Sequence, residues 1–408
     1  MASIKGPRSA LTDFIEENNI KIRPNGFIND NLLLEKPVKP VEQRKKRVKR
    51  VKKQMPVELV NLDTINKTDK DIKVEEILEN LENINYLEDD QLRDISSYLS
   101  RHRIYNRNFI AKIIKLSSDN LVIYDCSDIK DEDYIINKNL KVLELYQCGQ
   151  LTSSRINKIL KAQKKLEVLR LTGGYLVTEL ELPKSLKVLD LTNCSRLDDR
   201  IITEINRKYK TLEELRLSFC YKINGNIQLK IPVNKLFLCE TKITEDFICN
   251  IPKIDQVKAL SLNKCPLVNN LPIEFKSIEY LDIEGLTELK NLNICSKLKI
   301  LNCKQCFNLP LELLSYFESL EILNISYLQF DFDTISYFTF LKELDISWCP
   351  SVFDNLIFEI LDKFNLEKMY VFGCFGLSPK MSEDSWNNNR RTKVLGNPAE
   401  TKFLILND

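Results

Sequence analysis

The sequence predicts an α/β leucine-rich-repeat solenoid, a horseshoe of the cysteine-containing subclass with parallel strands inside and helices outside. The first observation is the phrase L-x-x-L-x-L-x-x-C, which is complete in "LKVLELYQC" from Leu140 and in "LKVLDLTNC" from Leu186. The second is its spacing, because copies begin 19 to 26 residues apart, in or next to the range of roughly 20 to 29 for such repeats. The third is the apolar alternation inside the phrase, which suits a short strand with one buried face.

About twelve copies of the phrase bind residues 121–376 into one solenoid. A single repeat cannot cover its own apolar edge, so neighbours stack and a continuous core forms along the array. The copies begin at Leu121, where the phrase is degenerate, and at Leu140, Leu166, Leu186, Leu212, Val233, Val257, Ile278, Leu298, Leu320, Leu341 and Leu366.

Cysteine dominates the ninth position of the phrase, where a small apolar group fits a turn toward the core. We therefore expect most of the twelve cysteines to be reduced and structural. The pair Cys303 and Cys306 has the spacing of a zinc half-site, but these are the sixth and ninth positions of one repeat and should both face inward. The ninth-position cysteines are Cys148, Cys194, Cys220, Cys265, Cys306, Cys349 and Cys374.

Residues 1–55 are predicted to form a mostly disordered basic tail. They carry fourteen Lys or Arg and six Asp or Glu, a net charge of +8, which leaves −6 for the rest of a chain whose net charge is +2. The run at 44–53 suits a nuclear-import signal or a contact with DNA phosphates, and a solvated basic linker is the alternative. Its basic residues are Arg44, Lys45, Lys46, Arg47, Lys49, Arg50, Lys52 and Lys53.

A short helix is expected within residues 5–20 of this tail. Ser9 suits an N-cap, and Leu11, Phe14 and Ile15 fall on one helical face. A helix of about ten residues is marginal by itself in water. We therefore expect it to dock on a partner, with packing on the chain's own body as the alternative.

Helical periodicity then predicts a cap domain at 56–120, whose last helix should cover the open end of the solenoid. Residues 377–408 should form a C-terminal cap, with a final strand from "KFLIL" at 402–406.

Catalysis is not expected. His102 is the only histidine, and the ten glycines form no phosphate-binding loop. We therefore expect no catalytic residue, cofactor, metal or small-molecule substrate. The opening "MASIKGPRSALTDF" lacks the apolar run of a signal peptide, and no apolar run approaches the roughly 20 residues that span a bilayer.

The inner wall of the solenoid is the expected interaction surface. It mixes both charges with aromatic residues, which favours a protein partner over the continuous basic stripe that nucleic acid requires. The residues expected to contact the partner are Arg170, Arg216, Lys235, Phe237, Trp348, Tyr370 and Phe372.

Three stretches resemble the fungal Rad-seven family, the leucine-rich-repeat subunit of the damage-recognition complex in global-genome nucleotide excision repair. "YLSRHRIYNRNF" followed by "LKVLELYQCGQLT" is similar to that family in order and spacing, as is "LEKMYVFGCFGLSP". The specific stretch is "KGPRSALTDFIEENNI", which resembles the family motif G-P-x-S-A-L-T-x-F. The matching positions are Gly6, Pro7, Ser9, Ala10, Leu11, Thr12 and Phe14.

This resemblance implies a non-catalytic nuclear scaffold that works with a SWI/SNF-type ATPase in recognising damage in non-transcribed DNA. It also implies a link to a cullin ubiquitin ligase through elongin C, with damaged DNA or chromatin reached through the complex. The alternative is an F-box-type substrate receptor of an SCF ubiquitin ligase, which shares cysteine-rich repeats.

Overall fold

The structure is a computed structural model that describes residues 69–104, 107–136, 139–294, 297–378 and 392–396. The chain divides into two units, of which the second, Ile65–Asp408, holds all the described residues. The expected docking helix at 5–20, the basic run at 44–53 and the expected strand at 402–406 all lie outside the described residues.

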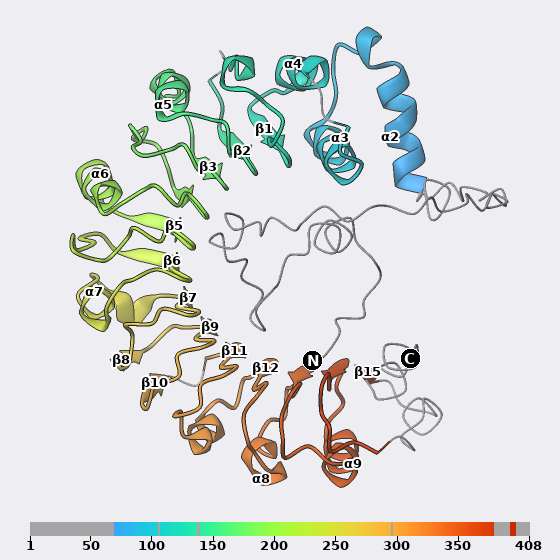
Figure 1. Cartoon of the computed structure of the whole chain (residues 1–408), viewed down its shortest axis with the longest axis vertical. Coiled ribbons are helices and arrows are strands. Elements are labelled where there is room, and N and C mark those ends of the chain that lie inside the picture. The colour runs from blue at the N-terminus through green and yellow to red at the C-terminus, as the bar shows by residue number, and fades with distance from the viewer. Residues whose placement is uncertain (1–68, 105–106, 137–138, 295–296, 379–391, 397–408) are drawn as a thin grey trace, which may run out of the picture. The chain divides into compact units, whose positions relative to one another are not determined.

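The second unit is built on one parallel sheet, which has thirteen strands within the described residues and follows the order of the chain throughout. Figure 1 shows these strands on the inner side of a curved array, with the helices of the repeats on its outer side. The α/β leucine-rich-repeat solenoid predicted from the sequence is confirmed. The strands are β1 Asn120–Ile123, β2 Val142–Leu145, β3 Val168–Leu171, β4 Val188–Asp190, β5 Leu212–Arg216, β6 Val233–Phe237, β7 Ala259–Ser261, β9 Tyr280–Asp282, β11 Ile300–Asn302, β12 Ile322–Asn324, β13 Glu343–Asp345, β14 Lys368–Tyr370 and β15 Lys393–Leu395.

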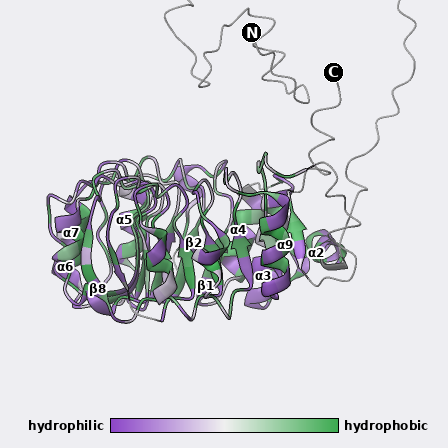
Figure 2. Cartoon of the chain, turned by 90° about the horizontal axis from the view of Figure 1, so that it is seen from below, coloured by the Kyte–Doolittle hydropathy of each residue, from purple (hydrophilic) through white to green (hydrophobic). Residues whose placement is uncertain are grey.

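Helices follow the strands in several repeats and bury one apolar face each. In α6, for example, Ile201, Ile202 and Ile205 are buried, while Arg207 and Lys208 lie in its last turn. Figure 2 accordingly shows hydrophilic and hydrophobic residues on the same helices and largely hydrophobic strands. The helices of the repeats are α5 Ser153–Lys161, α6 Arg200–Lys208, α7 Glu245–Cys249, α8 Phe332–Ile335 and α9 Asp354–Lys363, with 3-10 turns η4 Asp131–Asp133, η5 Ile254–Gln256 and η6 Leu311–Tyr316.

Two repeats carry a strand where the sequence pattern predicts an outer helix. β8 Leu271–Phe275 and β10 Leu292–Ile294 pair in parallel as a separate two-stranded sheet. Leu271 and Phe275 are fully buried and Pro272 and Glu274 are exposed. These are short repeats, and an extended segment returns to the next strand with fewer residues than a helix, because it rises about 3.3 Å per residue against 1.5 Å.

A helical cap precedes the first strand and consists of α2 Asp69–Glu79, η3 Leu81–Asn83, α3 Asp89–Arg101 and α4 Arg107–Leu116. Both α3 and α4 lie at the open end of the solenoid: α3 contacts β1, and Ile113 of α4 lines the same small cavity as Leu121 and Val122 of β1. The Ser96 hydroxyl of α3 accepts a hydrogen bond from the Tyr124 amide at 3.0 Å, while Leu92 and Ile95 are buried.

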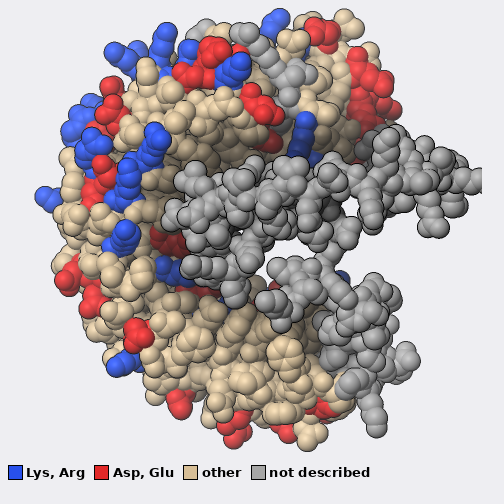
Figure 3. All heavy atoms as spheres, viewed as in Figure 1, with Lys and Arg blue, Asp and Glu red and all other residues tan. Residues whose placement is uncertain are grey.

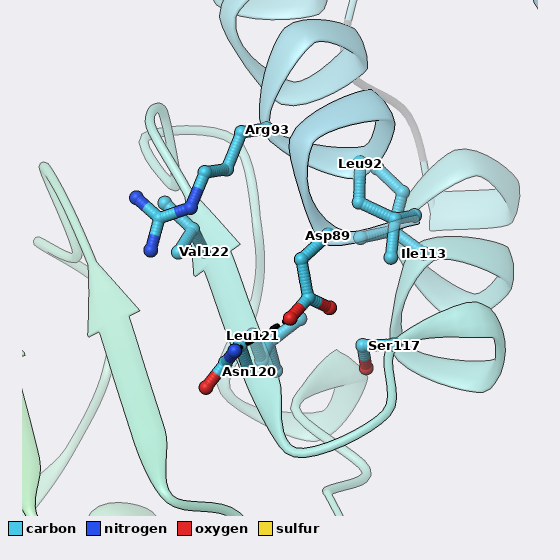
Figure 4. Close-up of a pocket in the computed structure, with 8 residues that line it drawn as sticks. All are labelled: Asp89, Leu92, Arg93, Ile113, Ser117, Asn120, Leu121 and Val122. Carbon is cyan, nitrogen blue, oxygen red and sulfur yellow. Dashed lines mark hydrogen bonds between the residues drawn. The ribbon is translucent and has the colours of Figure 1, made fainter. Parts of the chain in front are cut away.

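The junction between the cap and β1 is closely packed. In Figure 4, Asp89 at the start of α3 faces Asn120 of β1. The Asn120 Nδ2 donates a hydrogen bond to the Asp89 carboxylate at 2.5 Å. The cavity beside them has a volume of about 10 Å³, room for about one water molecule. This contact therefore closes the solenoid and offers no ligand site.

The register of the first repeat differs from the one expected from the sequence. Leu121 pairs with Leu143, and Ile123 pairs with Leu145. Leu121 therefore occupies the fourth position of the phrase and not the first, so that this repeat begins at position 118. The shift makes Cys126, which is fully buried, an additional ninth-position cysteine.

The ninth-position thiols bond to the backbone of a neighbouring repeat, except that of Cys126, which donates to Ile123 within its own repeat at 3.8 Å. Cys194, Cys220, Cys265, Cys306, Cys349 and Cys374 donate to the carbonyl oxygen at the sixth position of the preceding repeat, over 3.0 to 3.3 Å. Cys148 donates instead to the Thr172 carbonyl at 3.3 Å. These thiols are at most 6% exposed, and the expectation that they face inward is confirmed.

The residue before each ninth position is left-handed. From Gln147, with φ of 58°, to Gly373, with φ of 64°, the eighth position has a positive φ in all eleven successive repeats. Its backbone amide can donate a hydrogen bond to the seventh-position carbonyl of the next repeat. Asn193 donates to Ser218 in this way at 2.8 Å, and Trp348 donates to Phe372 at 2.7 Å. The chain therefore turns sharply after every strand and bonds to its neighbour as it does so.

We predict that the ninth-position thiols resist alkylation in the folded protein. Burial raises the pKa of Cys220 and of Cys306 to about 12, so little of the reactive thiolate forms at pH 8. Cys239, at a seventh position on the inner face, is only partly buried and should react with iodoacetamide before the ninth-position thiols. Peptide mapping by mass spectrometry would measure the order, with the urea-unfolded chain as control. Alkylation of Cys220 at the rate of Cys239 would contradict the packing described here.

Candidate partner-binding surface

The inner face of the sheet gathers most of the residues expected to contact a partner. Arg170 lies on β3, Arg216 on β5, Lys235 and Phe237 on β6, and Tyr370 on β14. The first four lie on three strands that are separated only by β4, whereas Tyr370 lies far along the array. The predicted set is therefore divided into two parts of the solenoid.

The sequence pattern suggested that Trp348 and Phe372 lie on strands. They lie instead in the turns that follow β13 and β14. Trp348 is the left-handed eighth-position residue of its repeat and is 46% exposed. Its ring stacks on Tyr327 with centroids 5.9 Å apart and meets Phe375 edge-on at 5.9 Å. A side chain at Gly373 would overlap the Trp348 indole. These aromatic residues form an exposed cluster at the carboxyl ends of the last strands.

Arg170 is held by three carboxylates on the inner face. Its guanidinium lies 3.5 Å from Glu144, 3.2 Å from Asp190 and 3.2 Å from Glu214. Burial opposes ionisation of Glu214, but hydrogen bonds and charges from Arg216 and Arg170 outweigh it, so that the pKa of Glu214 lies below its ordinary value. The network joins four strands side by side. Its cation is therefore engaged within the protein and is less available to a partner than the sequence suggests.

Next to this network, aromatic and cationic side chains meet. The Arg216 guanidinium lies 3.7 Å from the centroid of the Phe237 ring, a cation–π geometry. The Phe237 and Tyr280 rings lie 6.1 Å apart. Tyr280, Lys258 and Lys299 line the same surface as Phe237. The sequence did not predict this, because the three residues come from three other repeats and meet Phe237 only when the repeats stack.

The second position of the phrase carries alternating charges along the sheet. From the first repeat to the twelfth, the residues at this position are Asp119, Lys141, Glu167, Lys187, Glu213, Asn234, Lys258, Glu279, Lys299, Glu321, Lys342 and Glu367. Adjacent members form ion pairs of 2.6 to 3.0 Å, namely Lys141–Asp119, Lys187–Glu167, Lys299–Glu279 and Lys342–Glu321. We call this row the second-position ladder.

Charge is unevenly spread over the repeats. On the face seen in Figure 3, Lys and Arg gather over the repeats around α5 and α6, whereas the repeats that carry α8 and α9 show mostly uncharged side chains. The described residues hold no group of three or more His, Cys, Asp or Glu side chains placed to bind a metal ion. In the same part of the chain, no helix combines the length and apolar character needed to cross a membrane.

Comparisons with known proteins show similarity at the level of structure. No protein-family model matches the sequence, and no curated protein matches it. Among 37 matching solved chains, one from the crystal structure of the Rad7 and Elc1 complex in yeast has a TM-score of 0.55 and 19% identity. The match covers 81% of this chain and 92% of that one. At this identity the likeness shows the fold alone.

A leucine-rich-repeat protein of Leptospira interrogans matches at a TM-score of 0.28 and 15% identity, over 78% of this chain and 97% of that one. This second likeness is too weak to support an argument.

We predict that Arg170→Met destabilises the fold by about 2 kcal/mol, because it leaves three carboxylates without their shared cation. This loss of unfolding free energy should become smaller as the pH falls through the range in which carboxyl groups titrate, near about 4. The depressed pKa of Glu214 means that its ionised form stabilises the fold above that range, and protonation removes the contribution. Urea denaturation from pH 7 to below pH 4 would measure both effects.

Arg200→Met is the matched control, since Arg200 is an exposed arginine that pairs only locally with Asp198; it should change little. Equal stability of Arg170→Met and the wild type would show that the network does not contribute to folding.

Proposed function

We propose that the chain is a non-catalytic scaffold of nucleotide excision repair that acts in the nucleus with a SWI/SNF-type ATPase in recognising damage in non-transcribed DNA. The observation that carries the proposal is the match to a chain of the Rad7 and Elc1 complex, which spans 92% of that chain. The motif at Gly6 to Phe14 supports it independently, because a solenoid fold alone does not require that stretch.

The inner face of the sheet suits a role in assembly. Its ion pairs and aromatic contacts join side chains from many repeats, and an extended surface of this kind is what solenoids use to bind other proteins. Aromatic residues and arginine, which gather here as Phe237, Tyr280 and Arg216, are common anchors of protein interfaces.

Elongin C is a second proposed partner, with a cullin ligase beyond it. The neighbouring solved chain was crystallised in a complex with Elc1. In this chain the candidate box falls at Val57 to Asn61, where valine and asparagine replace the leucine and cysteine of the usual motif. Binding would then be weaker than through a regular box, and damaged DNA or chromatin would be reached through the complex.

We predict that Leu11→Ala combined with Phe14→Ala releases the ATPase while the solenoid stays folded. The two side chains share one face of the expected helix, and no repeat contains them. Affinity purification from nuclear extract with mass spectrometry would report the partners, and circular dichroism with thermal melting would report the fold. Ile22→Ala with Ile28→Ala, also in the tail but beyond residues 5–20, is the control and should keep the ATPase.

Recovery of a Skp-type adaptor in place of a helicase-like ATPase would contradict the repair role and support an F-box-type receptor. A fall in melting temperature of the Leu11 and Phe14 double variant would show instead that this segment belongs to the chain's own body.

We predict that the basic run directs nuclear import, because eight positive charges within ten residues are what an import receptor binds. Changing Lys45, Lys46, Arg47, Lys49 and Arg50 to alanine should move a fluorescent fusion into the cytoplasm. Alanine at Lys21, Arg23, Lys36 and Lys39 removes tail charges outside the run and should leave import intact. Unchanged nuclear accumulation of the first variant would refute this assignment.

A further inference from the structure

The alternation of charge along the second-position ladder is interrupted at one place in the array. Charges alternate from Asp119 to Glu213, and they alternate again from Lys258 to Glu367. Between these two blocks stands Asn234, an uncharged residue, so Lys258 follows a position that offers no carboxylate. Among the described residues Lys258 has no ion pair, whereas Lys187, Lys299 and Lys342 each have one.

A depression of about 520 Å³ lies at this point of the inner face. It lies over β6 and the starts of β7, β9 and β11, beside the end of β5. Its charged lining consists of Arg216, Lys235, Lys258, Glu279 and Lys299. Glu279 pairs with Lys299 at 3.0 Å, and Arg216 pairs with Glu214 at 2.5 Å. Lys235 and Lys258 are both exposed and form no ion pair with any described residue. The depression therefore carries two ammonium groups outside any ion pair with described residues, although the charge of Lys258 also helps to lower the pKa of Glu279.

Its remaining lining is apolar. Phe237, Ala259, Tyr280 and Ile300 complete the surface, with Ala259 buried and the other three partly buried. Burial, reinforced by nearby Asp282, raises the pKa of Tyr280 to about 12, so its ring remains neutral at physiological pH. The depression thus combines an apolar floor with unpaired ammonium groups at its edge.

The surrounding inner face limits what can bind there. Asp190 and Glu214 lie on the side of the depression toward β4 and β5, and Asp282 and Glu284 lie at and just beyond the carboxyl end of β9, next to it. A nucleic-acid strand that followed the sheet would meet these carboxylates, whereas its backbone requires a continuous basic track. The four strands span about 15 Å at about 4.8 Å between neighbours. That width accommodates four or five residues of an extended peptide, at about 3.4 Å each.

We propose that this depression binds a short acidic segment of a protein partner, with carboxylates against Lys235 and Lys258 and an apolar side chain over Phe237 and Tyr280. The complementary charge of the pocket and the acidic boundaries around it both point to this occupant. The site goes beyond the repair role proposed above and does not depend on it, because the segment is defined by chemistry and not by a particular complex.

Fluorescence anisotropy would test the proposal with a short fluorescein-labelled peptide of alternating aspartate and leucine. The protein would be the full chain with the five alanines in its basic run, so that the tail does not attract the probe. Lys235→Glu combined with Lys258→Glu should weaken binding about tenfold or more, since two attractions become repulsions. Lys187→Glu combined with Lys342→Glu is the matched control, because these ladder lysines lie outside the depression and should leave affinity unchanged.

Binding that is saturable, weakened by raised salt and lost only in the first double variant would support the proposal. It would be overturned by absence of binding to the wild-type depression, or by equal loss in the control, which would indicate non-specific attraction to any lysine. A labelled oligothymidylate is the competing probe. Tighter binding of that probe through Lys235 and Lys258 would assign the depression to nucleic acid and also overturn the proposal. Circular dichroism would confirm that both double variants fold, as expected for exposed side chains.

Discussion

The turn after each strand is the constraint on which the whole array depends. A strand that ends inside a stack leaves backbone groups that water cannot reach, and each must find a partner in the protein. The left-handed eighth residue directs its amide to the next repeat, while the ninth-position thiol reaches the sixth-position carbonyl of the previous one, as Cys220 does with Leu191. Cysteine suits this place because it is compact and apolar, yet still donates a weak hydrogen bond.

The sequence predicted the repeats well wherever the phrase is regular, because its apolar positions repeat the same packing problem. The prediction failed at the first repeat, where Leu121, Val122 and Ile123 are consecutive apolar residues and hydrophobic periodicity cannot set the register. Pairing with β2 sets it instead. The outer segments were also less predictable, since the repeats containing β8 and β10 bury apolar residues on extended chain and not on a helix.

The inner face was predictable in part. Strand alternation placed Arg170, Arg216 and Phe237 on it correctly, because one residue in two must point that way. Which residues meet across the face depends on stacking, so neither the three carboxylates around Arg170 nor the contact of Phe237 with Tyr280 could be inferred from one repeat. A signal was nevertheless present in the alternating second positions, which become visible once all repeats are aligned by register.

The second-position ladder also constrains how such a chain can change in length. Loss of the single repeat that starts at Leu186 would bring Glu167 beside Glu213, two like charges, whereas loss of that repeat together with the one before it would bring Lys141 beside Glu213. The outer elements follow a similar rhythm at first, since α5, α6 and α7 fall in alternate repeats. The natural unit of duplication or deletion in this part of the array is therefore a pair of repeats, and designed variants of different length should be cut accordingly.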